Sequence, residues 1–102
     1  MNDSEKEALI DLGNLGWSPK KLTKLKDKGI PDFICSENRY VELKKSHSYF
    51  IHIREDQMAK WADLLNENKR VFLYVFTREH QEKILFELTL INRIKKDGKK
   101  YE

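Results

Sequence analysis

The sequence predicts an α/β protein in which helices are layered around one mixed sheet. Apolar residues recur at helical spacing near the N-terminus and again at residues 55–68. Short extended runs lie between these stretches, and residues 71–77 are apolar almost throughout, as expected for a central strand covered on both faces. No repeat or low-complexity linker divides the chain, so we expect residues 1–102 to form a single domain.

The N-terminal part of the chain predicts two helices. Ser4, followed three residues later by Glu7, is a capping box, and an apolar stripe at helical spacing continues after it. A second helix is expected to begin with Ser18 as its N-cap and Pro19 at its first position, and to end at Gly29.

The remaining elements follow from extended runs and one more helical stretch. Strands are expected at residues 33–35, 40–43 and 49–53, a helix at 55–68, and further strands at 71–77 and 84–88. The order of elements is therefore helix, helix, strands, helix, strands, which is typical of a sheet packed between helical layers.

Composition restricts the class of protein. Hydrophobic residues make up 39% and charged residues 36% of the 102 residues, so one core can form beneath a charge-rich surface. A single cysteine, Cys35, excludes an internal disulfide. No apolar run approaches the roughly 20 residues of a membrane span, and the acidic N-terminus does not resemble a secretory signal. We therefore expect a soluble, cytoplasmic protein without membrane contact.

Positive charge is concentrated in two segments. The net charge is only +3, but residues 18–28 carry +4 and residues 93–102 carry +3, which leaves −4 for the rest. This asymmetry is typical of a surface for a polyanion, although a solvated lysine-rich tail is the better explanation of the second segment. Three lysines of the expected second helix are four residues apart and would line one side, facing either a phosphate backbone or solvent: Lys20, Lys24 and Lys28.

Polar side chains gather on one face of the extended run at residues 40–43 and its continuation. Glu42 and Lys44 are two residues apart, so they project from the same face of a strand. Val41 and Leu43 point to the other face, where a core is expected. A carboxylate and an ammonium group are therefore expected side by side.

The turn at residues 36–38 decides where Asp32 lies. A three-residue turn pairs the strands so that Asp32 lies opposite Glu42, whereas a two-residue turn would direct Asp32 to the other face. Only the first register puts Phe33 and Cys35 on the same face as Val41, so the core pattern favours it.

Two facing carboxylates destabilise a sheet unless something neutralises them. A divalent cation between Asp32 and Glu42 is the simplest neutraliser, and oxygen ligands favour Mg²⁺ or Mn²⁺ over zinc. Such an ion polarises a phosphodiester and makes hydroxide accessible near neutral pH, and Lys44 could orient or deprotonate the attacking water or stabilise the added charge. An exposed salt-bridge cluster on an edge hairpin is the alternative.

These residues resemble the motif of a known enzyme group. Gly29-Ile30-Pro31-Asp32 and, ten residues further, Glu42-Leu43-Lys44 are similar to the signature of the PD-(D/E)XK nuclease superfamily. Gln57 and Trp61 on the next helix add the pattern of its compact VRR-NUC and Holliday junction resolvase-like branches. The likeness covers roughly residues 29–77 and implies a restriction-endonuclease-like α/β/α core. Family members often have a strand ahead of the Asp-bearing one, where we expect the basic helix.

The resemblance implies a role for each motif residue. Asp32 and Glu42 would bind Mg²⁺, with Mn²⁺ as a substitute, the Leu43 carbonyl would add a ligand, Lys44 would be catalytic, and Gln57 would face the site. Family members often add an acidic residue from the first helix, and Glu5 is the candidate metal ligand here. Lys45 and Ser46 are candidates for contact with the DNA backbone. An ordinary surface role is the alternative for each of these residues.

By this resemblance, the chain is expected to be a metal-dependent DNA endonuclease, selective for branched DNA such as a four-way junction. Because one chain has one active site, a homodimer is the simplest way to cut two strands. The alternative is a non-enzymatic DNA-binding protein, in which residues 5–28 form a helix-turn-helix and the following hairpin a wing. The exposed face of its second helix, however, is nearly all lysine and lacks the side chains that read bases.

Overall fold

The computed structural model describes residues 1–23, 28–90, 96–97 and 99–101 of the chain. The elements, in chain order, are α1 (Asp3–Asn14), β1 (Lys20–Lys21), β2 (Phe33–Cys35), β3 (Arg39–Ser46), α2 (Glu55–Asn66), β4 (Arg70–Thr77) and β5 (Glu82–Glu87), with β6 (Lys96–Asp97) and β7 (Lys99–Tyr101) in a separate two-stranded sheet. In the described part of the chain, neither helix has the length and apolar character needed to cross a membrane.

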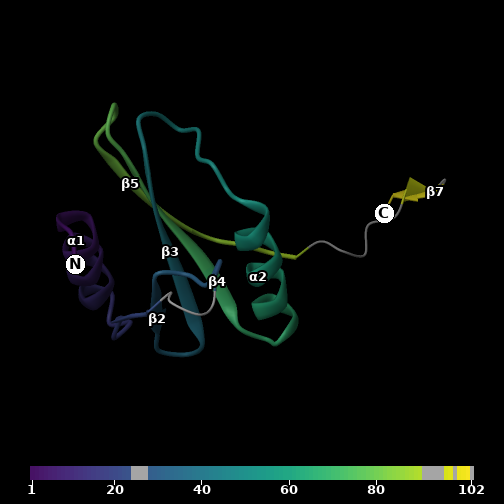
Figure 1. The fold of residues 1–102 in the computed structure, drawn as a ribbon, viewed down its shortest axis with the longest axis horizontal. Coiled ribbons are helices and arrows are strands. Elements are labelled where there is room, and N and C mark those ends of the chain that lie inside the picture. Colours follow the sequence, from purple (N-terminus) through teal and green to yellow (C-terminus); the bar gives the residue numbers. More distant parts are fainter. Residues whose placement is uncertain (24–27, 91–95, 98, 102) are drawn as a thin grey trace.

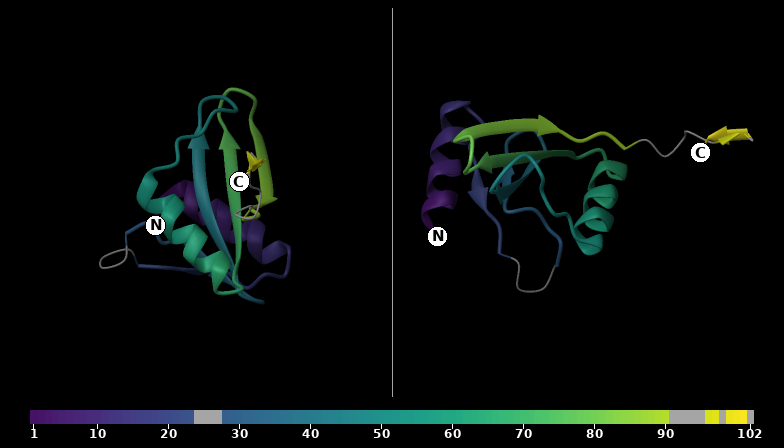
Figure 2. Two further views of the ribbon diagram at one scale, coloured as in Figure 1. Left: turned by 90° about the vertical axis from the view of Figure 1, so that its right-hand side faces the viewer. Right: turned by 90° about the horizontal axis from the view of Figure 1, so that it is seen from above.

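The main sheet is mixed and lies between the two helices. Its strand order is β1-β2-β3-β4-β5, with β3 and β4 parallel and the other neighbours antiparallel. Helix α2 connects the two parallel strands and packs on one face of the sheet, whereas α1 packs on the other (Figures 1 and 2). The prediction of an α/β fold with a mixed sheet between helical layers is therefore confirmed.

Strand β4 divides the hydrophobic core into two halves. Phe72 and Tyr74 face α1, where they join Ala8, Leu12, Phe33 and Val41. Val71, Leu73 and Val75 face α2 and pack with Trp61 and Leu64. The apolar run at residues 71–77 is thus buried on both sides, as its composition predicts.

The register of the β2–β3 hairpin follows the core pattern. Cys35 pairs with Arg39 and Phe33 pairs with Val41, which is the register of a three-residue turn. Two turn residues, Glu37 and Asn38, have φ of +59°, so the turn uses left-handed backbone to reverse the chain. Burial raises the pKa of the Cys35 thiol to about 11, so this residue packs as a small neutral side chain.

The start of α1 differs from the prediction. Its N-cap is Asn2, whose side chain accepts a hydrogen bond from the Glu5 backbone N–H, and the Glu5 side chain accepts one from the Asn2 N–H. Ser4 lies inside the helix, and Glu7 pairs with Lys83 on β5. The sequence holds two overlapping capping-box patterns, and the earlier one forms, so the helix begins at Asp3.

The predicted second helix is wrong over residues 18–23. Lys20 and Lys21 form an edge strand, in which Lys20 pairs with Ile34. The pairing extends beyond the strand: the Leu22 N–H donates to the Asp32 carbonyl at 2.8 Å. Proline is as suitable beside an edge strand as at a helix start, and pairing satisfies backbone groups of β2 that would otherwise lack partners. The remainder of that prediction, residues 24–27 with Lys24, lies outside the described residues.

Residues 49–53 form a loop rather than the expected strand. Both edges of β3 are already paired, with β2 and with β4, so no place next to it is open to a further strand. Ile51 and Ile53 instead pack against the core beneath α2. The last strand begins at Glu82, two residues before the expected start, because Glu82 pairs with Thr77 at the end of β4.

Candidate active site

A carboxylate is buried on the face of the sheet that α2 covers. Glu42 is only 3% exposed, between Val41 and Leu43, which face α1. Strand alternation therefore puts Glu42 on the α2 face, with Lys44 two residues further. The predicted pairing of Glu42 with Lys44 on one face of β3 is confirmed: Lys44 Nζ lies 3.7 Å from Glu42 Oε2.

Gln57 holds these two side chains together. It lies in the first turn of α2 and is 1% exposed. Its Nε2 donates to Glu42 Oε2 at 2.9 Å, and its Oε1 accepts from Lys44 Nζ at 2.8 Å. The same Oε1 accepts from the backbone N–H of Arg54 at 3.1 Å, so the amide makes three hydrogen bonds. We call Glu42, Lys44 and Gln57 the polar trio.

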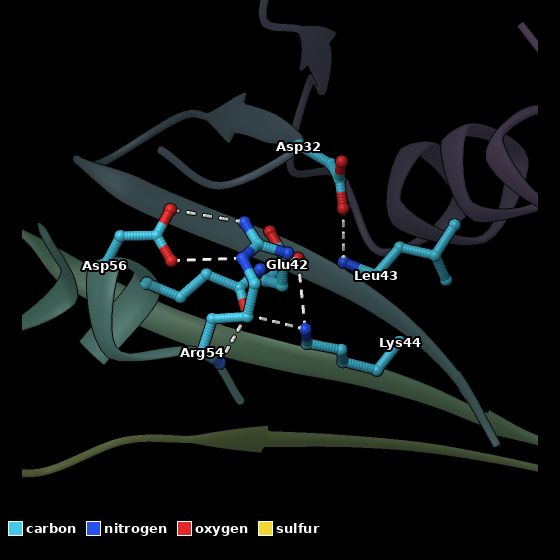
Figure 3. Close-up of polar contacts among 7 residues, drawn as sticks. Asp32, Glu42, Leu43, Lys44, Arg54 and Asp56 are labelled. Atoms are coloured by element: carbon cyan, nitrogen blue, oxygen red, sulfur yellow. Dashed lines mark hydrogen bonds and ion pairs between the residues drawn. The ribbon is translucent and has the colours of Figure 1, made fainter. Parts of the chain in front are cut away.

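Two further charged residues lie at the start of α2, beside the polar trio (Figure 3). The Arg54 guanidinium bonds the Asp56 carboxylate through Nε at 3.0 Å and through a terminal nitrogen at 3.4 Å. The hydrogen bond that Arg54 donates to Asp56 raises the pKa of Arg54, and the charge of Glu42 adds to this effect. Arg54 in turn lowers the pKa of Asp56. Sequence reasoning missed Arg54, and its position three residues before Gln57 was the available signal.

Asp32 lies against the next residue of β3. It immediately precedes β2 in the pairing that aligns it with Glu42, and its Oδ2 accepts a hydrogen bond from the Leu43 backbone N–H at 2.8 Å (Figure 3). In an extended strand the N–H and C=O of one residue project to the same edge. The Leu43 carbonyl therefore faces the same edge of β3 as its N–H, which is the edge where the Asp32 carboxylate lies.

Gly29 explains how the Asp32 segment comes close to α2. Its φ is +83°, and a Cβ there would lie 2.4 Å from the Asp56 carbonyl oxygen and 3.2 Å from the Gln57 nitrogen. Only glycine allows this approach. Gly29, three residues before Asp32, thus packs directly on the helix turn that carries Gln57.

The donor set of this place suits a hard divalent cation. The oxygens available from the motif are the carboxylates of Asp32 and Glu42 and the carbonyl of Leu43, and Mg²⁺ prefers such ligands and keeps several waters. Among the described residues, no three His, Cys, Asp or Glu side chains form a group that could hold a metal. The donors that the motif offers to such an ion are therefore two carboxylates and one carbonyl, with water completing the shell.

Glu5 is not brought to this site in the described structure. Its side chain caps α1 and lies 3.5 Å from Lys21 Nζ. The basic candidates are spread over several elements: Lys20 is exposed on β1, Lys28 is exposed in the turn before Gly29, and Lys45 is exposed on β3. Because residues 18–23 are not helical, the expected row of lysines along one helix face is wrong. Ser46 Oγ is occupied by the Phe50 carbonyl and the Ser48 N–H.

Comparison with known proteins adds no family. No protein-family model matches the chain, and no curated protein matches it.

Proposed function

We propose that this chain is a Mg²⁺-dependent endonuclease that hydrolyses phosphodiester bonds in DNA. The observation that carries the proposal is the polar trio: a buried glutamate, a lysine two residues later and a glutamine from the next helix, joined by hydrogen bonds of 2.8 and 2.9 Å. Asp32 lies against the neighbouring backbone of the same strand. The mixed sheet between α1 and α2 is consistent with a restriction-endonuclease-like core.

Asp32, Glu42 and the Leu43 carbonyl would hold Mg²⁺, or Mn²⁺ in its place. The bound ion would supply a Lewis acid that polarises the phosphodiester and lowers the pKa of water. Gln57 fixes the carboxylate of Glu42 through its Nε2, so this ligand keeps its orientation without solvent around it. Gln57 is thus a positioning residue.

Lys44 would supply positive charge to the reacting phosphate. Its Nζ donates to Gln57 Oε1 at 2.8 Å and lies 3.7 Å from Glu42 Oε2, so these contacts hold the side chain in one place. A fixed ammonium stabilises the negative charge that develops on the phosphoryl oxygens in the transition state. We therefore propose electrostatic stabilisation as the role of Lys44.

The proposed substrate is branched DNA, with the four-way junction as first candidate, and the proposed active form is a homodimer. Two copies related by a two-fold axis would place one active site on each of two strands. Exposed basic residues suited to phosphates lie on β1, in the turn before Gly29 and on β3: Lys20, Lys28 and Lys45. The helix-turn-helix alternative needs a recognition helix from residue 18, and residues 18–23 form an edge strand and its flanks instead.

A cleavage panel tests the proposal. Purified chain is incubated with Mg²⁺ or Mn²⁺ and single-stranded, duplex, flap and four-way DNA. Asp32→Asn and Glu42→Gln should each lower the cleavage rate by about 10²-fold or more and weaken Mn²⁺ binding measured by electron paramagnetic resonance. Glu42→Gln keeps an oxygen that accepts from Gln57, so the variant should fold. Glu67→Gln, an exposed glutamate at the end of α2, is the matched control.

Two results would overturn the assignment. One is full activity in either ligand variant, since the metal would then be held elsewhere. The other is the absence of cleavage by the unaltered chain on every DNA and with both metals, while the protein is folded and binds DNA.

A further inference from the structure

Phe50 is the most exposed large hydrophobic side chain of the described residues. It is 87% exposed, and the adjacent Tyr49 is 55% exposed. Isolated apolar side chains are common on protein surfaces and need no explanation by themselves. Here, however, two aromatic residues stand next to each other in the loop that connects β3, with Glu42 and Lys44, to α2, with Gln57.

The loop that carries Phe50 is bonded to β3 and to the β4–β5 hairpin. The Ser46 hydroxyl donates to the Phe50 carbonyl and accepts from the Ser48 N–H. The Tyr49 ring stacks on His80, with centroids 4.3 Å apart and an angle of 11° between the planes. The Tyr49 hydroxyl also bonds a carboxylate oxygen of Glu82 at 2.5 Å. The loop is thus anchored to β3 and to the β4–β5 hairpin.

Backbone hydrogen bonds strengthen this connection. The Arg78 N–H donates to the Ser46 carbonyl at 2.8 Å, and the Glu79 N–H donates to the His47 carbonyl at 2.7 Å. A side chain on such an ordered loop loses little further conformational freedom when it binds a ligand. Phe50 is therefore presented on an ordered loop, and the described part of the chain leaves it 87% exposed.

The position of Phe50 relates it to the polar trio. Its carbonyl is bonded to Ser46, which follows Lys44 by two residues on β3. Two residues of a strand span about 7 Å, roughly the rise of two nucleotides along a DNA strand. A DNA strand with its scissile phosphate at Lys44 could therefore reach Phe50 with a base close to the cleavage point.

We propose that Phe50 stacks on an unpaired base at a DNA branch point and so gives the nuclease its preference for branched substrates. This inference rests on the proposed function. The faces of bases are accessible only where strands are unpaired or unstacked, whereas a duplex would first have to be opened. Stacking on an aromatic residue strengthens binding by roughly 5- to 150-fold per base and tolerates any base.

The surroundings of Phe50 are polar and charged rather than apolar. The exposed basic residues and histidines in its loop and in the segments next to it are Lys45, His47, His52, Arg54 and Arg78. The exposed acidic residues there are Glu55, Asp56, Glu79 and Glu82, of which Asp56 is paired with Arg54 and Glu82 is bonded to Tyr49. Lys45 and Arg78 are the cations that could meet phosphates on either side of a stacked base.

The test measures binding separately from cleavage. DNA flaps, four-way junctions and plain duplexes carry 2-aminopurine at the branch or at the matching duplex position, and the chain is added in EDTA. Stacking on Phe50 should quench the fluorescence at the branch. Phe50→Ala should abolish this quench and weaken binding to branched DNA at least fivefold, with duplex binding changed less than twofold. Phe50→Trp should preserve both effects.

Phe86→Ala is the matched control, because Phe86 is also a partly exposed phenylalanine but lies on β5. An unchanged ratio of branched to duplex affinity in Phe50→Ala, in a chain that cleaves DNA with Mg²⁺, overturns the stacking role and leaves the nuclease assignment standing. Equal weakening on both DNAs also overturns it. Quenching that depends on Phe50, without cleavage under any metal, supports the stacking and contradicts the proposed function.

Discussion

Replacing Gln57 by glutamate tests the polar trio without relying on any activity. The substitution keeps the shape of the side chain but exchanges the amide donor for a carboxylate oxygen 2.9 Å from Glu42 Oε2, in a place where both residues are at most 3% exposed. Two carboxylates this close cannot both ionise readily, so the pair retains one shared proton. Lys44 and the Arg54 N–H still bond the other oxygen.

The size of the effect follows from the cost of holding that proton. An ordinary glutamate has a pKa of about 4.3, and each pH unit above this adds about 1.4 kcal/mol to the cost of protonation. Gln57→Glu should therefore lower the free energy of unfolding by about 4 kcal/mol at pH 7 and by about 1 kcal/mol at pH 5. The sign is fixed because the folded variant binds the extra proton, so its stability falls as pH rises from about 4.3.

Urea denaturation in a chelating buffer at several pH values between 5 and 8 measures this directly. The difference between Gln57→Glu and the unaltered chain should grow by about 1.4 kcal/mol per pH unit. Gln81→Glu is the matched control, because Gln81 is exposed in the β4–β5 turn and its replacement should change stability by less than about 0.5 kcal/mol. A pH-independent loss, or no loss at pH 7, would refute the buried contact between Gln57 and Glu42.

Three further perturbations have defined outcomes. Gly29→Ala would put a Cβ 2.4 Å from a backbone oxygen at a residue with φ of +83°. It should lower the free energy of unfolding, measured in urea, by about 2–5 kcal/mol. Gly13→Ala, in open space on α1, is the control and should raise that free energy by about 0.5–1 kcal/mol. Burial raises the pKa of Asp11, but hydrogen bonds from Tyr74 and Lys83 have the larger combined effect, so the pKa lies below its usual value. Asp11→Asn should therefore remove about 1 kcal/mol of stability at neutral pH. In acid titrations this difference should disappear as pH falls below about 3.8. Lys44→Ala should slow single-turnover cleavage by about 10²-fold or more, because the positive charge beside the phosphate is lost. Lys44→Arg keeps that charge and should recover most of the cleavage rate. An arginine variant as slow as the alanine variant contradicts the electrostatic role.

The parts of the fold that the sequence predicts correctly are those in which many residues agree. The hairpin register followed from the need to place Phe33 with Val41 in one core, a requirement that a one-residue slip would violate at every position. The double-sided burial of β4 and the helix at residues 55–66 likewise depend on long, consistent patterns. Such patterns predict tertiary structure well, because only one arrangement of the strands and helices buries all of their apolar residues together.

The predictions that failed depended on local signals with two meanings. Ser18 and Pro19 are typical of a helix start, but the same residues precede an edge strand, and the exposed side of β2 decides between the two. Asn2 and Ser4 both head capping-box patterns, and nothing local ranks them. The need for Gly29 was also hidden, since it arises from contact with α2, 27 residues further along the chain.

The cost of burying Glu42 is the strongest physical reason to assign chemistry to this place. A carboxylate in an apolar layer loses its hydration, and attraction to Lys44 with a hydrogen bond from Gln57 restores only part of that loss. Replacing such buried ionic groups with apolar residues of similar volume is often neutral or stabilises proteins by about 1–4 kcal/mol. Leucine at position 42, opposite Leu73 on β4, would fit such a layer if positions 44 and 57 were also apolar, because no charge or amide would then be left without its partner. Stability alone is therefore a weak explanation of the polar trio, whereas a carboxylate fixed beside an ammonium group suits the metal-assisted hydrolysis that we propose.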